Sequence, residues 1–135
     1  RKGRHTLRGI DAVRCFSVNV PTSRMVKVVD FCGIYSGKDR DKSKLFTIGK
    51  GENPHIPLIN ECPVNLECNF LHSLDLGSHT LIIGQITQTY VREDCLQGKT
   101  VDPLLVDPLI YATSSETYHR LGQVVGQAFQ VGKEL

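Results

Sequence analysis

Motifs that mark several large enzyme classes are missing from this sequence of 135 residues. It has no Gly-x-Gly-x-x-Gly run and no Gly-x-x-x-x-Gly-Lys-Ser/Thr run, which excludes the usual dinucleotide-binding and phosphate-binding loops. It also has no His-Glu-x-x-His run and no Gly-x-Ser-x-Gly run, which excludes the usual zinc-peptidase and serine-hydrolase sites. Any site must therefore be built from polar residues scattered along the chain.

The cysteines form no recognisable metal or disulfide framework. They are odd in number and include no Cys-x-x-Cys pair, unlike zinc fingers and small secreted domains. We expect partly buried thiols in a reducing compartment, which indicates a cytoplasmic protein. Cys32 remains a candidate redox-sensitive thiol, because it lies just before a polar loop. The five are Cys15, Cys32, Cys62, Cys68 and Cys95.

Charge and hydropathy argue against two classes of partner. The formal net charge is +2, too mild for the concentrated basic surface that indicates nucleic-acid binding. No apolar run approaches the roughly 20 residues that span a bilayer, and no signal peptide opens the chain, so no membrane partner is expected. With 40% hydrophobic and 22% charged residues, the chain is expected to form a single folded domain over residues 1–135.

The first third of the chain predicts two helices around a strand. Apolar residues at three-residue spacing predict a helix over His5–Val13, and the following alternating residues predict a strand over 15–20. A second helix is expected to open at Thr22 and end near Gly33. A polar loop over 36–42, a short helix over 42–46 and a loop over 49–57 are expected to follow.

The middle of the chain predicts a β-hairpin. Residues 65–71 and 80–90 alternate between apolar and polar types, and Gly77 lies in the turn between them. Residues 96–102 are expected to be a linker and 109–111 a short strand. An apolar stripe predicts a helix over 117–129. The expected fold class is therefore mainly β with flanking helices.

Several scattered polar residues suit a small anion. Arg4 and Thr6 lie at the start of a predicted helix, where free N–H groups and the helix dipole favour a phosphate. Ser36, Lys38 and Lys42 lie in a glycine-containing loop that can present N–H groups and positive charge. His79 follows the hairpin turn. Each of these also fits a plainer interpretation: a solvated helix start, a charged surface turn and an exposed histidine.

Short runs in the right order are similar to those of the flavin reductase-like domain family. They are VNVP at 18–21, DFCG at 30–33, SGKDRDK at 36–42, ECPVNLEC at 61–68, LGSH at 76–79, LIY at 109–111 and LG at 121–122. Together they cover nearly the whole chain and most resemble the flavoredoxin branch.

The resemblance implies a split β-barrel that binds FMN non-covalently as a homodimer. By matching position, it implies that Arg4, Thr6, Ser36 and Lys42 hold the phosphate and that His79 approaches the flavin. Lys38 stands where arginine is usual, which keeps the charge but loses the planar fork, and His5 stands where the family often has tyrosine. The family's opening strands have no counterpart before Arg1, so the barrel is expected to be truncated at its N-terminus.

Three functions fit this resemblance. The first is an NAD(P)H-dependent flavin reductase, an oxidoreductase in which the flavin carries the chemistry and the protein supplies binding. The second is an FMN electron-transfer protein that works with a redox partner protein and has no NAD(P)H site of its own. The third is a truncated paralogue that no longer binds flavin. No catalytic residue and no metal ligand is assigned.

Overall fold

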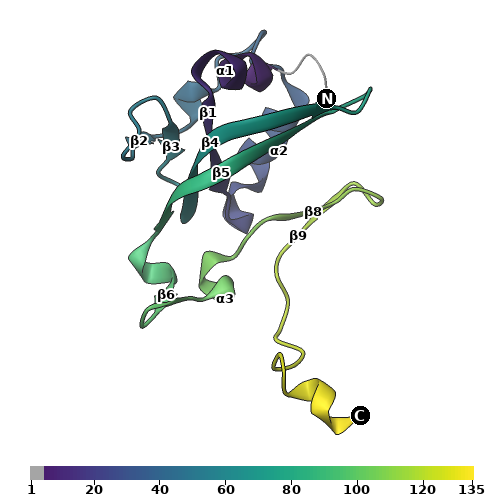
Figure 1. The fold of residues 1–135 in the computed structure, drawn as a ribbon. Helices are drawn as coiled ribbons and strands as arrows, with labels where there is room; N and C mark the ends of the chain where they lie inside the picture. The colour runs from purple at the N-terminus through teal and green to yellow at the C-terminus, as the bar shows by residue number, and fades with distance from the viewer. Residues whose placement is uncertain (1–4) are drawn as a thin grey trace.

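The computed structural model describes residues 5–135, and its centre is a three-stranded antiparallel sheet. The sheet consists of β1 (Cys15–Val20), β4 (Val64–Asp75) and β5 (Thr80–Val91), with β4 in the middle (Figure 1). Strand β1 pairs with the first half of β4, from Val20 opposite Val64 to Cys15 opposite Asn69. The second half of β4 pairs with β5 alone and continues outward as a two-stranded ribbon.

The hairpin of β4 and β5 confirms the prediction made from alternating residues. Its register runs from Val64 opposite Val91 to Asp75 opposite Thr80, with two shifts in the middle that bend and twist such ribbons. The turn is closed by the Leu76 N–H, which donates to the His79 carbonyl over 2.9 Å. Gly77 has a φ of 80° there, a left-handed conformation that favours glycine.

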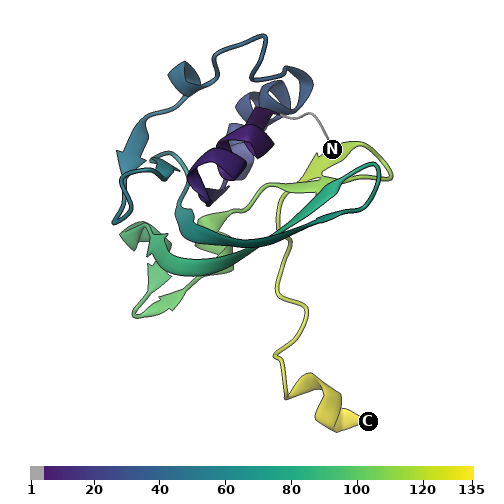
Figure 2. The same ribbon diagram turned by 45° about the horizontal axis from the view of Figure 1, so that its top comes forward.

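Both predicted N-terminal helices are present, on the same side of the sheet (Figure 2). Helix α1 spans His5–Val13 and buries Ile10, the middle residue of its predicted apolar stripe. Helix α2 spans Val26–Ile34 and follows a 3-10 turn, η1 (Ser23–Met25), so the predicted second helix begins slightly later than expected. The polar loop over 36–42 then leads into η2 (Ser43–Leu45), which stands where a short helix was expected.

Short elements fill the rest of the chain. The ends of the expected loop over 49–57 are paired as strands β2 (Ile48–Lys50) and β3 (Pro57–Ile59), and the expected linker over 96–102 contains a small hairpin. The short strand expected near 110 is β8. The remaining elements are η3 (Glu93–Cys95), β6 (Leu96–Gln97), β7 (Thr100–Val101), α3 (Pro103–Val106), β8 (Ile110–Ala112) and β9 (Thr117–His119).

The core lies between the sheet and the β2–β3 hairpin. Cys15, Ile56 and Leu58 form its buried cluster, and Tyr90 of β5 packs against them. Two hydrogen bonds between β1 and β3 fix this arrangement: Ser17 Oγ donates to the Pro57 carbonyl over 2.6 Å, and the Ile59 N–H donates to Asn19 Oδ1 over 2.9 Å. The core thus anchors the segment that carries Pro57 beside α1.

The predicted helix over 117–129 is wrong. Its first residues form β9, the next have no regular structure, and the chain ends in a 3-10 turn, η4 (Val131–Glu134), on an arm that projects away from the body (Figure 1). Gly122 and Gly126 each disfavour a helix by about 1 kcal/mol. The apolar stripe also finds nothing to pack against, because Val125 and Phe129 are 99% and 92% exposed. Helices in proteins owe most of their stability to such packing.

Candidate functional site

A cavity of about 800 Å³ lies between the beginning of the described part of α1, the end of α2 and the polar loop. Its wall combines hydroxyl groups and cationic side chains with apolar surface. The lining residues are His5, Thr6, Cys32, Gly33, Ser36, Gly37, Arg40, Asp41, Lys42, Ser43, Phe46, Pro57 and Ile59. We call it the anion cavity. It gathers three of the predicted site residues from two distant parts of the sequence: Thr6, Ser36 and Lys42.

Lys42 is held in the wall by the last turn of α2. Its Nζ donates to the Cys32 carbonyl over 2.8 Å. A cation at the carboxyl end of a helix is favourable, because carbonyl groups and the negative end of the dipole face it there. The ammonium group has three donors, so one bond to Cys32 leaves two for a ligand. The contact therefore places the Lys42 charge beside the cavity without using up its donors.

The loop over 36–42 is shaped by Ser36. Its carbonyl accepts from the N–H groups of Asp39 and Arg40, each over 3.1 Å, and its Oγ accepts from the Lys38 N–H over 3.2 Å. Such a serine-centred turn bends the chain back on itself. The bend brings Arg40 and Lys42 to the same cavity, while Lys38 is exposed and does not line it.

Gly37 lets the loop approach α1 closely. A Cβ atom at this position would lie 3.2 Å from both Cβ and Cδ2 of His5, closer than ordinary van der Waals contact. The His5 ring therefore rests on the loop backbone. This contact closes the anion cavity between two segments more than 30 residues apart.

The carboxylate in the wall, Asp41, interacts with its neighbours in the sequence. Asp41 Oδ1 accepts from Ser43 N over 3.0 Å and from Ser43 Oγ over 2.6 Å, and Lys44 Nζ lies 4.0 Å from Asp41 Oδ2. These hydrogen bonds, the Ser43 hydroxyl first, hold the pKa of the Asp41 carboxyl below its usual value. Among the described residues of the wall, the two cations Arg40 and Lys42 therefore face a single carboxylate, Asp41, which already accepts hydrogen bonds from Ser43.

A smaller, mainly apolar cavity adjoins the anion cavity. It has a volume of about 320 Å³ and shares His5, Thr6 and Pro57 with its larger neighbour. Its other lining residues are Gly9, Ile10, Val13, Cys15, Phe16, Ser17 and His55. A cationic hollow next to an apolar one suits a ligand that joins an anionic group to a flat apolar group.

Of the other predicted site residues, one is not described by the structure and one lies away from the anion cavity. Arg4 lies outside the described residues. His79 is exposed at the tip of the β4–β5 hairpin, where its Nδ1 lies 2.8 Å from Ser78 Oγ, and it does not line the anion cavity. His5 and Arg40 also line the anion cavity, although neither is among the residues that the sequence predicts for the site. Both stand next to predicted site residues, in Arg4-His5-Thr6 and in Arg40-Asp41-Lys42, so adjacency is the signal that would have found them.

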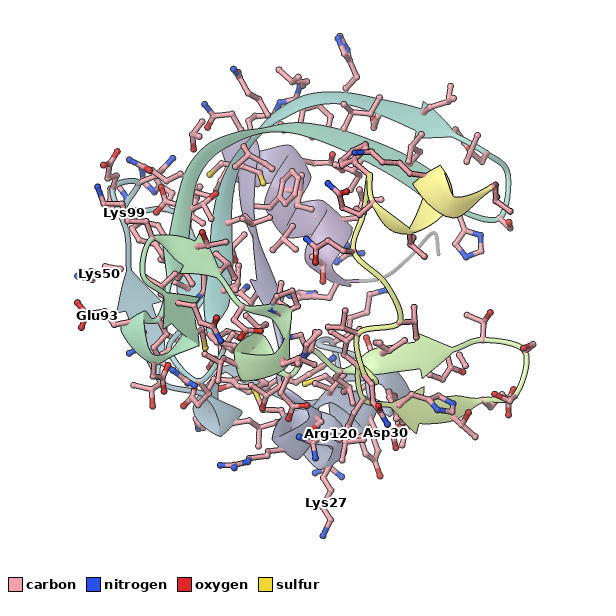
Figure 3. The ribbon with its side chains drawn as sticks, turned by 90° about the horizontal axis from the view of Figure 1, so that it is seen from below. Lys27, Asp30, Lys50, Glu93, Lys99 and Arg120 are labelled. Atoms are coloured by element: carbon pink, nitrogen blue, oxygen red, sulfur yellow. The ribbon has the colours of Figure 1, made fainter. Side chains whose placement is uncertain are left out.

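The far side of α2 is tied to the C-terminal hairpin. Tyr118 of β9 donates to Asp30 Oδ1 over 3.0 Å, and its ring centroid lies 5.1 Å from that of Tyr111. Arg120 Nε donates to Asp107 Oδ1 over 2.8 Å, and Figure 3 shows Arg120 on the same side of the molecule as Asp30. The bond from Tyr118 to Asp30 ties the C-terminal hairpin to α2, whose last turn holds Lys42.

The cysteine side chains are free thiols, and four of them are buried. Burial, with the nearby Glu61 charge adding to it, raises the pKa of Cys62 to about 11. Cys32 is half-buried and lines the anion cavity. Among residues 5–135 no three His, Cys, Asp or Glu side chains are placed to hold a metal ion. No helix in this part of the chain is long and apolar enough to cross a membrane.

Comparison with known proteins identifies the family. Residues 1–121 match the family model of the flavin reductase like domain. The structure superimposes on flavoredoxin from Methanosarcina acetivorans with a TM-score of 0.94 at 37% sequence identity, covering 98% of this chain and 72% of that one. Flavoredoxin of Desulfovibrio vulgaris (Miyazaki F) gives a TM-score of 0.88 at 34% identity over the same shares. The chain therefore belongs to the flavin reductase-like family.

The same comparisons confirm the predicted fold class. The protein is mainly β with a few helices, and it has the split-barrel fold of its structural relatives. A curated relative, an uncharacterised protein from Archaeoglobus fulgidus, is 38% identical over 73 residues. That match covers 53% of this chain and 41% of the relative, so the chain spans less than half of that protein's length.

Proposed function

We propose that this chain binds FMN without a covalent bond and places the phosphate group in the anion cavity. The observation that carries the proposal is the pairing of a cationic cavity with an adjoining apolar one. FMN has matching parts, a dianionic phosphate and a flat flavin ring. The chain's membership of the flavin reductase-like family and its likeness to two flavoredoxins support this choice of ligand over other phosphate esters.

Each residue of the cavity has a defined task in this proposal. Lys42 supplies positive charge, and Thr6 and Ser36 supply hydroxyl donors to the phosphate oxygens. Lys38, on the exposed side of the same loop, and Arg4 add further positive charge. His79 would meet the flavin ring from the hairpin tip. FMN, when bound, supplies hydride and electron transfer, and the protein supplies binding, orientation and access.

The reaction we propose is NAD(P)H-dependent reduction of bound flavin. The alternative is an electron-transfer protein that takes electrons from a redox partner protein, and the likeness to flavoredoxins favours it as well. A third candidate is a paralogue that keeps the fold and no longer binds flavin. The protein should be loaded with FMN, desalted and mixed with NADH or NADPH in the absence of oxygen. Rapid bleaching of retained flavin supports the reductase, retained flavin without bleaching supports the electron carrier, and a colourless protein supports the third candidate.

We also propose that two copies of this single-domain chain associate. Large apolar side chains are exposed on the β4–β5 hairpin and on the C-terminal arm, including Leu74 and Leu76 at 56% and 57% and Val125 at 99%. Such surface is costly in water, and a second copy would cover it. Sedimentation equilibrium should give twice the monomer mass, and a monomer at all concentrations would contradict the proposal.

The free thiols fit a cytoplasmic location.

A further inference from the structure

We propose that His5 is a proton-dependent ligand of the FMN phosphate. When its imidazole ring is protonated, it adds a positive charge to the anion cavity, so the affinity for FMN rises as the pH falls from 8 toward 6.5. This inference rests on the proposed FMN site and adds a mode of regulation to it. It concerns a residue that differs in chemistry from the hydroxyl and lysine ligands proposed above.

The position of the His5 ring carries the argument. His5 lines both the anion cavity and the apolar cavity, so it stands at the boundary where a phosphate would meet the rest of the ligand. Its ring rests on Gly37, because a Cβ atom there would lie 3.2 Å from Cδ2 of His5. The side chain is exposed, so the ring can exchange protons with water. The ring is therefore placed beside the ligand by the loop that also carries Ser36 and Lys42.

His5 is the one histidine among the described residues that line the anion cavity. Histidine is the side-chain type that changes charge between pH 5 and 8, whereas lysine and arginine stay positive over that range. Asp41 stays negative, because the Ser43 hydrogen bonds lower the pKa of its carboxyl. His55 lines only the apolar cavity. The titratable and charged groups that line the two cavities with His5 are Cys32, Arg40, Asp41, Lys42 and His55. Arg8 follows on the same helix, and Lys38 and Asp39 belong to the loop that the ring contacts.

Proton binding and phosphate binding then assist each other. A dianion in the cavity attracts the imidazolium, and by linkage the imidazolium favours the dianion to the same extent. A proton moves from solvent to the ring in the fraction of molecules whose ring is neutral before FMN binds. The effect has a lower limit, because a phosphate monoester takes up its own proton near pH 6 and loses half its charge. The affinity gain is therefore confined to the interval from about pH 8 to about pH 6.5.

The test compares FMN with riboflavin, which lacks the phosphate. Dissociation constants for both are measured at pH 6.5, 7.2 and 8.0 and at constant ionic strength, for the wild type, His5→Tyr and His55→Gln. Tyrosine keeps a ring to pack on Gly37 and does not titrate below about pH 9. We expect the preference for FMN over riboflavin to rise roughly fivefold from pH 8.0 to 6.5 in the wild type and in His55→Gln. In His5→Tyr the preference should not rise, because only the phosphate itself then takes up a proton as the pH falls.

A second measurement needs no variant. Calorimetric titration of the wild type with FMN at pH 7.2, in two buffers of different ionisation enthalpy, should show uptake of a fraction of a proton. The His5 assignment would be overturned by the absence of proton uptake or by a wild-type preference for FMN that does not change with pH. It would also be overturned if the rise in preference at low pH persisted in His5→Tyr or disappeared in His55→Gln. None of these results would contradict FMN binding itself. Failure of the wild type to bind FMN at any pH would overturn the proposed function and this inference with it.

Discussion

Removing the Thr6 hydroxyl and the Lys42 ammonium group should weaken FMN binding and leave riboflavin binding unchanged. In the double variant Thr6→Ala, Lys42→Ala the cavity loses one hydroxyl and one ammonium group. A hydrogen bond to a charged group contributes about 1.5–3 kcal/mol, so the two losses together amount to about 3–6 kcal/mol. At about 1.4 kcal/mol for each tenfold change, FMN affinity should fall by at least about 100-fold.

The assay separates this loss from a change of fold. Lys42 also donates to the Cys32 carbonyl, so its removal should lower the free energy of unfolding by about 0.5–1.5 kcal/mol. Lys44→Ala is the matched control, because Lys44 is a neighbouring lysine that is 84% exposed and does not line the cavity. Riboflavin affinity should stay the same in every variant. An FMN affinity in the double variant equal to that of Lys44→Ala would refute the phosphate assignment.

Three further predictions follow from single positions. His79→Ala should change the absorption spectrum or reduction potential of bound flavin while the free energy of unfolding changes by less than about 0.5 kcal/mol, because His79 is exposed; an unchanged spectrum and unchanged reduction would remove His79 from the site. Gly37→Ala should weaken FMN binding measured by fluorescence, because its new Cβ would lie 3.2 Å from the His5 side chain and push the loop away; wild-type affinity would show that the loop contact is unimportant. Burial raises the pKa of Cys62 to about 11, so the folded state resists ionisation that an unfolded thiol undergoes near pH 9, and stability should fall as the pH rises from about 9 to about 11. Chemical denaturation across that interval should show a shallower loss in Cys62→Ala, and an equal loss in both proteins would contradict the prediction.

The elements predicted correctly are those specified by local patterns. Helix α1 has its apolar residues on one face, and the β4–β5 hairpin has alternating strands joined by a turn around Gly77. The arm after β9 shows the opposite case. Its residues have helical spacing, but the two glycines weaken the helix and no surface of the same chain covers Val125. Spacing alone cannot show whether a packing partner exists.

The residue types in the site could be predicted from the sequence, but their meeting in one cavity could not. The types of Thr6, Ser36 and Lys42 suggested an anion, and the family resemblance selected the same residues. Their meeting depends on α1 lying against the loop at Gly37, a contact between distant segments that no local pattern encodes. The same contact brings His5 into the cavity, so its place in the site could not be predicted from the sequence alone.

A flavin fluorescence titration shows whether the anion cavity binds the phosphate of FMN. The purified chain is added to FMN, to riboflavin and to FAD, under identical conditions. We expect saturable quenching, with FMN bound at least tenfold more tightly than riboflavin and FAD bound more weakly than FMN. No quenching with FMN, or equal affinity for FMN and riboflavin, would contradict this expectation.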